Sequence, residues 1–250
     1  MSKIKVRLVG GLGNQLYQFG FALLLLERFG YEKIIIDCSD MDNYKENWGY
    51  MLSIVLDDSK LDGRVDFGQS WVLKSRFVKL TSSIDLGVFG LVSDNNYGHV
   101  LEYSSNSTLY LDGYFSHEDH TDKIIDAVKP YLRDDLFIDF PDNALVVNVR
   151  GGEYARLGWA SPEDAILYKI LIQKALAKMH NPIIHLVTDD VEYSESILSG
   201  FCDIGVIHEP NPVDNFCVLI SARHKILSKS TFSKWAGYLS SEAAEVYYIT

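Results

Sequence analysis

Apolar stretches of strand length alternate with longer helical segments along much of the chain, and this pattern predicts an α/β protein. The N-terminal part begins with an apolar strand over residues 4–9 and a glycine-rich turn. An apolar helix over residues 15–29 and a second strand over residues 33–37 follow. A strand, a crossover helix and a second strand form the βαβ unit of nucleotide-binding folds, so we expect parallel strands here.

The rest of the chain divides into an irregular part and a regular part. Residues 38–106 lack a period and predict irregular helices and loops, before a strand over 108–112 and a helix over 122–131. After Pro141 we expect strands over 144–150, 183–187, 204–207, 225–227 and 246–249, with helices over 162–179, 191–198, 213–223 and 232–239. Apolar strands that alternate with helices indicate a parallel sheet covered on both faces. We therefore expect two domains, residues 1–140 and residues 141–250.

Composition and charge narrow the classes of function. Of the 250 residues, 47% are hydrophobic and 23% are charged, which is typical of a folded globular protein. Lys and Arg total 23 whereas Asp and Glu total 34, and the net charge of −11 disfavours general binding of nucleic acid. An anionic ligand therefore needs a local cationic site.

The cysteines and the N-terminus bear on the compartment. Cys38, Cys202 and Cys217 have neither disulfide-framework nor zinc-site spacing, which indicates buried thiols in a reducing cytoplasm. The first residues alternate between basic and apolar, as in a strand rather than a signal peptide. No apolar run reaches the roughly 18 residues of a membrane span, and peripheral membrane contact has no sequence marker.

Candidate chemistry lies where parallel strands end, because ligands of open α/β sheets bind beyond the carboxyl ends of the strands. The first such turn holds Gly11 and Gly13, which permit close approach of a ligand beside a helix N-terminus. A dinucleotide fingerprint would have a third glycine where Leu16 stands. Asp37 at the end of the second strand suits a ribose, so an NAD-dependent oxidoreductase is one alternative.

Two later strand ends carry groups suited to phosphate. Arg150 ends a buried strand before two glycines, as in a phosphate clamp; the alternative is an ion pair with Glu153 across the turn. Hydroxyls and a lysine in residues 228–233 lie at a strand-to-helix junction, where they can bind phosphate, although an ordinary helix cap by Ser230 or Thr231 is the commoner explanation. Asp189 and Asp190 suit a metal, a base or a helix cap. Adjacent residues that begin a helix point in different directions, so we expect no metal there.

Five segments together resemble the family-11 glycosyltransferases, the bacterial α-1,2-fucosyltransferases that use GDP-fucose. Residues 10–16, GGLGNQL, match the family's opening motif without a gap, and residues 111–115 are similar to its G-Y-F-Q element. Residues 148–154 align with H-x-R-R-x-D-Y, residues 188–190 with S-D-D, and residues 220–239 with the serine-rich C-terminal motif. The order and spacing of the segments agree across nearly the whole chain.

The resemblance implies a GT-B type fold, with two Rossmann-like α/β domains facing across a cleft. The N-terminal domain would serve the acceptor and the C-terminal domain the GDP-sugar. The implied reaction is inverting transfer of L-fucose, or a related deoxysugar such as colitose, without metal or cofactor. The acceptor would be a galactose-type hydroxyl of an oligosaccharide or lipid-linked glycan in O-antigen synthesis. The implied place is the bacterial cytoplasm, at the cytoplasmic face of the inner membrane.

The family motifs also imply roles for individual residues. The catalytic candidates are Arg150 on the donor diphosphate and Asn14 near donor and acceptor. Glu153 is a third catalytic candidate, chosen for its position one turn beyond Arg150, as the base that accepts the acceptor proton. The donor-binding candidates are Gly11, Gly13, Asn148, Arg150, Asp190, Ser230, Thr231, Phe232 and Ser233.

Four positions depart from the family pattern. Asn148 replaces the motif histidine, Gly151 the second arginine, Glu153 the aspartate and Lys234 a tryptophan. The loss of one arginine removes a cation from the diphosphate site, and Lys229 or Lys234 could restore it. These departures keep a second alternative open, a non-catalytic GDP-sugar-binding protein of the same fold.

Overall fold

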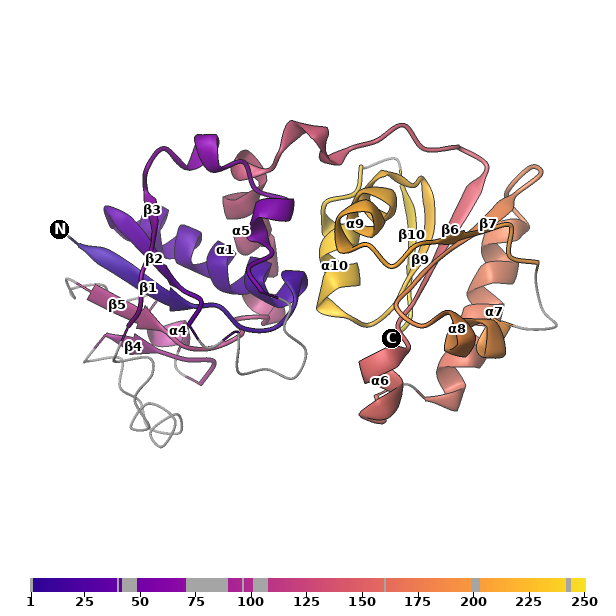
Figure 1. Cartoon of the computed structure of the whole chain (residues 1–250), viewed down its shortest axis with the longest axis horizontal. Coiled ribbons are helices and arrows are strands. Elements are labelled where there is room, and N and C mark those ends of the chain that lie inside the picture. Colours follow the sequence, from indigo (N-terminus) through magenta and orange to yellow (C-terminus); the bar gives the residue numbers. More distant parts are fainter. Residues whose placement is uncertain are drawn as a thin grey trace. The chain divides into compact units, whose positions relative to one another are not determined.

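The computed structural model describes residues 2–39, 41, 49–70, 90–95, 97–100, 108–159, 161–198, 203–241 and 244–250, without the side chains of residues 99, 100, 153 and 162. The chain forms two compact units, Met1–Arg133 and Asp134–Thr250, and each is described by itself. Each unit holds a five-stranded sheet with helices around it, and every pairing between strands is parallel (Figure 1). Within the described residues, no helix is both long and apolar enough to cross a membrane.

The sheet of the first unit has the strand order β3-β2-β1-β5-β4. Its strands are β1 (Lys3–Arg7), β2 (Lys33–Asp37), β3 (Val65–Phe67), β4 (Leu91–Val92) and β5 (Thr108–Leu111). Its helices are α1 (Leu12–Phe29), α4 (Tyr97–Val100), α5 (Glu118–Val128) and three 3₁₀ turns, Leu52–Ile54, Asp58–Leu61 and Lys129–Tyr131. The sequence pattern missed β3 and β4, because strands of two or three residues carry no readable period.

Helix α1 is buried along most of its length, which explains its nearly unbroken apolar sequence. It begins after Gly11 and ends at Gly30, whose left-handed conformation closes the helix. Gly20 lets α1 approach α5 closely, since a Cβ atom on Gly20 would lie 2.6 Å from Cγ2 of Ile124. The contact between these two helices thus depends on a missing side chain.

The sheet of the second unit has the strand order β10-β9-β6-β7-β8. Its strands are β6 (Ala144–Val149), β7 (Ile183–Thr188), β8 (Val206–His208), β9 (His224–Leu227) and β10 (Glu245–Tyr248). Its helices are α6 (Gly152–Arg156), α7 (Pro162–Leu176), α8 (Val191–Leu198), α9 (Pro212–Ser221), α10 (Thr231–Tyr238) and the 3₁₀ turn Asp134–Leu136. All six residues of β6 are buried, as its continuous apolar sequence predicted.

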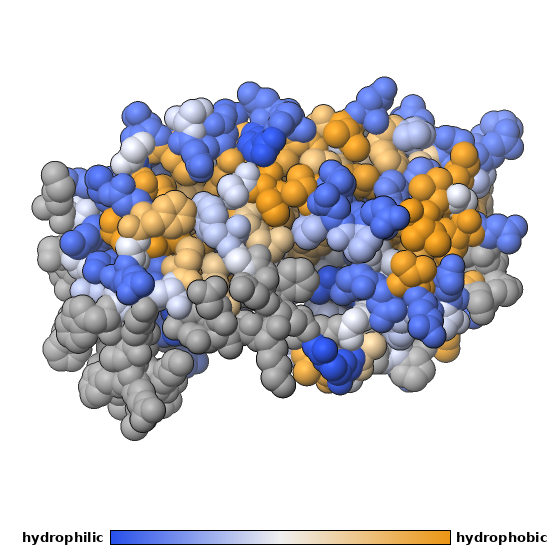
Figure 2. All heavy atoms as spheres, in the orientation of Figure 1, coloured by the Kyte–Doolittle hydropathy of each residue, from blue (hydrophilic) through white to orange (hydrophobic). Residues whose placement is uncertain are grey.

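The edge strand β8 is the most exposed strand of this sheet, and Val206 and Ile207 there stay accessible. Figure 2 shows apolar and hydrophilic side chains intermixed over the visible face, with a broad apolar area over the second unit.

The border between the units falls between Arg133 and Asp134, a few residues before the Pro141 position expected from the sequence. The intervening residues belong to the second unit because they bind it. The backbone N–H of Ile138 donates to Oγ of Ser221 at 2.9 Å. The ring of Phe140 packs against the rings of His185 and His208 at 5.2 and 6.2 Å between centroids.

Candidate functional site

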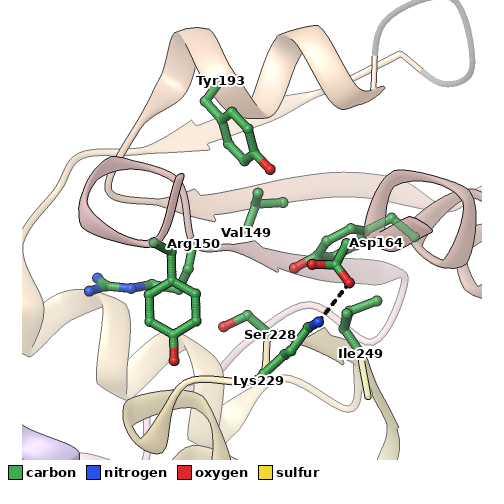
Figure 3. Close-up of a pocket in the computed structure, with 9 residues that line it drawn as sticks. Val149, Arg150, Asp164, Tyr193, Ser228, Lys229 and Ile249 are labelled. Carbon is green, nitrogen blue, oxygen red and sulfur yellow. Dashed lines mark ion pairs between the residues drawn. The ribbon is translucent and has the colours of Figure 1, made fainter. Parts of the chain in front are cut away.

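A pocket lies at the carboxyl edge of the second sheet, where β6 and β9 are neighbours. The chain adds β7 and β8 on one side of β6 and then crosses to add β9 and β10 on the other side. Open α/β sheets bind ligands at such a switch point. The pocket is lined by Val149, Arg150, Tyr154, Asp164, Tyr168, Tyr193, Ser228, Lys229 and Ile249 (Figure 3).

Two aspartates after β7 hold the turn that carries Arg150. Nη1 of Arg150 lies 2.9 Å from Oδ2 of Asp189, and the other oxygen of Asp189 accepts from the N–H of Gly151 at 2.9 Å. Asp190 accepts from the N–H of Gly152 at 3.1 Å and, at the start of α8, from the N–H of Tyr193 at 2.9 Å. The predicted alternative partner Glu153 has a side chain outside the described residues, so only the pairing with Asp189 is seen. Both aspartates are engaged in positioning this turn.

Arg150 retains hydrogen-bonding capacity for a ligand. Its side chain is 19% exposed, and its Nε–H is buried without an acceptor in the described structure. Its guanidinium carbon lies 5.9 Å from the centre of the Tyr154 ring, a cation–π distance. A guanidinium that is oriented from two sides and stays partly exposed suits an oxyanion ligand.

Asn148 lies beneath the pocket in a buried network of hydroxyls. Its Oδ1 accepts from the hydroxyls of Ser228, at 3.0 Å, and Ser233, and its Nδ2 donates to the carbonyl of Val187 at 3.1 Å. Ser230 and Ser233 lie 2.7 Å apart, Oγ to Oγ. The asparagine therefore ties the ends of β6, β7 and β9 together. Direct donor contact by Asn148 or Ser233, both buried, stays a prediction.

Helix α10 presents its N-terminus beside the pocket residues Ser228 and Lys229. Ser230 is the N-cap, and its Oγ accepts from the N–H of Ser233 at 3.2 Å. Thr231 begins the helix, and Phe232 packs edge-on against Phe216 at 5.3 Å between ring centroids. The cap interpretation of Ser230 is thus confirmed. Phosphate binding by the first turn is compatible with it, because helix N-termini favour anions.

The remaining polar groups of the pocket face one another across it. Nζ of Lys229 lies 2.8 Å from Oδ1 of Asp164, as the dashed line in Figure 3 marks. The hydroxyl of Tyr168 donates to the backbone carbonyl of Asn148 at 2.8 Å. Burial raises the pKa of Tyr168, and also that of Tyr193, so both hydroxyls stay protonated donors at neutral pH. The sequence pattern did not mark Asp164 or Tyr168, because both residues belong to an ordinary helical segment.

In the first unit, the glycine-rich turn after β1 is organised by two buried glutamines. Nε2 of Gln15 donates to the carbonyls of Gly10 and Gly49 at 2.8 and 2.9 Å, and Oε1 of Gln18 accepts from the N–H of Val9 at 3.0 Å. Gly10 has a φ of +76°, and a Cβ atom there would lie 2.6 Å from Nδ2 of Asn14. The motif thus folds Asn14 against its own turn. Gly11 and Gly13 lie at the start of α1, as predicted.

Asp94, a residue that the sequence pattern did not mark, anchors the segment after β5. Its carboxylate accepts from the N–H groups of Tyr114 and Phe115 at 2.8 and 2.6 Å. It also lies 3.4 Å from Nε2 of His117. A Cβ atom on Gly113 would lie 2.9 Å from the backbone nitrogen of Asp94, so a glycine is needed at this point. The segment that is similar to the G-Y-F-Q element is therefore a tight turn held by one carboxylate.

A comparison with models of protein families shows to which family the chain belongs. The model of glycosyl transferase family 11 matches residues 75–249, more than half of the sequence, including the Arg150 turn and the start of α10. The chain belongs to glycosyl transferase family 11. The glycine-rich turn at residues 10–14 precedes the matched range, so the family assignment does not depend on it.

Two characterised relatives are similar at low identity. The O-antigen biosynthesis glycosyltransferase WbnK of Escherichia coli is 22% identical, over 93% of this chain and 89% of its own length. The galactoside 2-alpha-L-fucosyltransferase SEC1 of Bos taurus is 27% identical over 40% of this chain. That second match spans only 29% of SEC1, less than a third of its length.

Solved structures confirm the fold class. The fucosyltransferase NodZ from Bradyrhizobium has a TM-score of 0.59 at 15% identity, covering 96% of this chain and 93% of its own. POFUT1 in complex with GDP has a TM-score of 0.57 at 11% identity, covering 99% and 98%. At these identities the likeness establishes the fold, which is α/β of the GT-B type with a Rossmann-like sheet in each unit.

Proposed function

We propose that this member of family 11 transfers L-fucose, or a related deoxysugar such as colitose, from a GDP donor to an oligosaccharide. The observation that carries the proposal is Arg150, whose side chain is held by Asp189 at the switch-point pocket and stays 19% exposed. The acceptor we propose is a galactose-type hydroxyl of a bacterial surface polysaccharide. The similarity to an O-antigen glycosyltransferase and to a galactoside 2-alpha-L-fucosyltransferase supports both parts.

The proposed donor is supported by relatives and by chemistry. NodZ has been solved after soaking with GDP-fucose, and POFUT1 with GDP. In this chain, Arg150 and Lys229 line one pocket beside the N-terminus of α10, within a protein of net charge −11. Each cation is paired with a carboxylate, Asp189 or Asp164, and both cations offer N–H donors that suit a diphosphate.

The proposed mechanism is inverting displacement at the sugar carbon. As the bond to the diphosphate breaks, negative charge builds on the β-phosphate, and the guanidinium of Arg150 and the amides of α10 stabilise it. Asp189 and Asp190 are occupied by Arg150 and by backbone amides, so we assign the leaving-group charge to protein groups rather than to a metal or cofactor. Glu153 remains our candidate for the base that accepts the acceptor proton, and Asn14 for a contact near the reacting groups.

The two competing functions make different predictions. A non-catalytic GDP-sugar-binding protein would keep GDP binding without turnover; Asn148 and Gly151 favour it. The NAD-dependent oxidoreductase needs Asp37 free for a ribose. Asp37 is instead buried, with Oδ1 accepting from the N–H of Ser39 at 3.0 Å and Oδ2 from the N–H of Ser70 at 2.6 Å. We therefore favour the transferase, acting in the bacterial cytoplasm beside the inner membrane, where lipid-linked acceptors would be reached.

The test is a transfer assay with GDP-fucose and GDP-colitose against an array of galactose-terminated oligosaccharides. We expect fucosylated or colitosylated product with release of GDP, resistant to EDTA. Binding of GDP without any product would favour the binding protein. A thermal shift with NAD but not with GDP would overturn the proposal in favour of the oxidoreductase.

A further inference from the structure

Lys229 and Arg150 follow the ends of two neighbouring parallel strands. In the pairing of β6 with β9, Val147 lies opposite Ile226, and Arg150 and Lys229 each stand three residues farther along the chain, just beyond the strand ends. Both side chains line the switch-point pocket (Figure 3). Lys229 is also the residue directly before Ser230, the N-cap of α10. Two cations from neighbouring strand ends therefore line one pocket.

The backbone next to Arg150 has no room for a second cation. A Cβ atom on Gly151 would lie 2.5 Å from Cβ of Asp190 and 2.8 Å from Cδ1 of Tyr193, both far below a normal contact. Asp190 cannot move away freely, because its carboxylate holds the N–H groups of Gly152 and Tyr193. A second positive charge in this pocket must come from another element.

Asp164 forms an ion pair with Lys229 at the wall of the pocket. Oδ2 of Asp164 accepts from the N–H of Ser161 at 3.1 Å as part of the α7 capping box, which leaves Oδ1 for Lys229 at 2.8 Å. The Asp164 side chain is 12% exposed and that of Lys229 is 36% exposed, so the pair sits at the pocket wall rather than in open solvent. An ammonium has three N–H donors, and this carboxylate engages one of them.

We propose that Lys229 is the second diphosphate-binding cation of this protein, and that Asp164 is its counterion while the pocket is empty. This proposal rests on the proposed function. The ammonium acts as a point charge on the phosphate oxygens, while the guanidinium of Arg150 supplies the directed N–H groups. Negative charge on the diphosphate competes with Asp164 for Lys229, so removal of the Asp164 charge strengthens phosphate binding.

The test is calorimetric titration of GDP and guanosine into wild type, Lys229→Met, Lys229→Arg and the matched control Lys234→Met, with folding checked by thermal melting. We expect Lys229→Met to weaken GDP binding about tenfold or more, the loss of one charge-assisted hydrogen bond, with guanosine unaffected. Lys229→Arg should retain most of the affinity, and Lys234→Met should change it less than about threefold, since Lys234 is not among the residues that line the pocket.

The variant Asp164→Asn tests the counterion role by itself. It removes the negative charge of Asp164, while the amide oxygen can still accept from the N–H of Ser161. We expect tighter GDP binding than wild type and unchanged guanosine binding. Equal GDP affinity in wild type and folded Lys229→Met would overturn this inference alone. Absence of GDP binding by wild type would overturn the proposed function, and this inference with it. Weaker GDP binding by Asp164→Asn would contradict the counterion role.

Discussion

At the scale of single residues, the proposed function depends most on Arg150. Its guanidinium is held by Asp189 and packed beside Tyr154, so its position is set before any ligand binds. A preorganised cation stabilises the transition state more than the ground state, and it should therefore affect kcat as well as KM. We expect Arg150→Ala to raise the barrier by roughly 2.7–4 kcal/mol, about a hundred- to a thousandfold in rate.

Arg150→Lys is the informative companion variant. An ammonium cannot reproduce the planar fork that faces both Asp189 and a phosphate, so we expect little recovery of kcat. Steady-state kinetics of both variants check this, with circular dichroism to establish folding. Near-normal kcat and donor affinity in folded Arg150→Ala would remove the phosphate-clamp assignment.

At the scale of elements, a buried lysine joins two helices of the second unit. Nζ of Lys225 on β9 donates to the carbonyls of Leu219 and Ile220 at the end of α9 and to Oγ of Ser240 after α10. Lys225→Met would leave these acceptors without a donor, and we expect a loss of about 1–3 kcal/mol in the free energy of unfolding. Urea denaturation measures it, with the partly exposed Lys234→Met as control.

The same lysine predicts a pH dependence. Burial lowers the pKa of Lys225 to about 7, from 10.5. Between these values the unfolded chain binds a proton that the folded protein lacks, so this group's contribution to stability rises with pH. The gap in unfolding free energy between wild type and Lys225→Met should therefore be wider at about pH 9 than at about pH 7. A constant or narrowing gap would show that Lys225 stays charged in the folded protein.

The contact between α1 and α5 gives a further test at this scale. A Cβ atom on Gly20 would lie 2.6 Å from Ile124 and 2.8 Å from Val128, both on α5. Gly20→Val should lower the free energy of unfolding by about 1–3 kcal/mol, the usual cost of overpacking. Gly20→Ala should lose less, because alanine favours the helix by about 1 kcal/mol over glycine. Unchanged stability of Gly20→Val would show that the two helices are not in close contact.

At the scale of the whole molecule, the sequence predicted the architecture best where strands are long and apolar. β6 is a run of six buried residues, and the helices after it begin at recognisable caps such as Ser161 and Ser230. β3 and β4 were missed because two or three residues define no period. The position of Arg150 at a ligand-binding edge was predictable, since any residue that follows a central parallel strand lies there.

The sequence did not predict which side chains of the site contact one another. The ion pair between Asp164 and Lys229 joins α7 to the end of β9, and its formation depends on how those elements pack. The closeness of Gly151 to Asp190 and Tyr193 is likewise a tertiary contact. Asp94 was missed because residues 38–106 carry no regular pattern, although its carboxylate fixes the turn after β5.

In the proposed function, a GDP donor binds at the switch point of the second unit, on Arg150 and the start of α10. Hydrogen–deuterium exchange with and without saturating GDP measures which segments this binding protects. We predict that, within the second unit, GDP slows exchange only in residues 150–153 and 229–233. Folded Arg150→Ala should show no such protection at the same GDP concentration. Unchanged exchange in both segments under conditions where GDP is bound would contradict the claim.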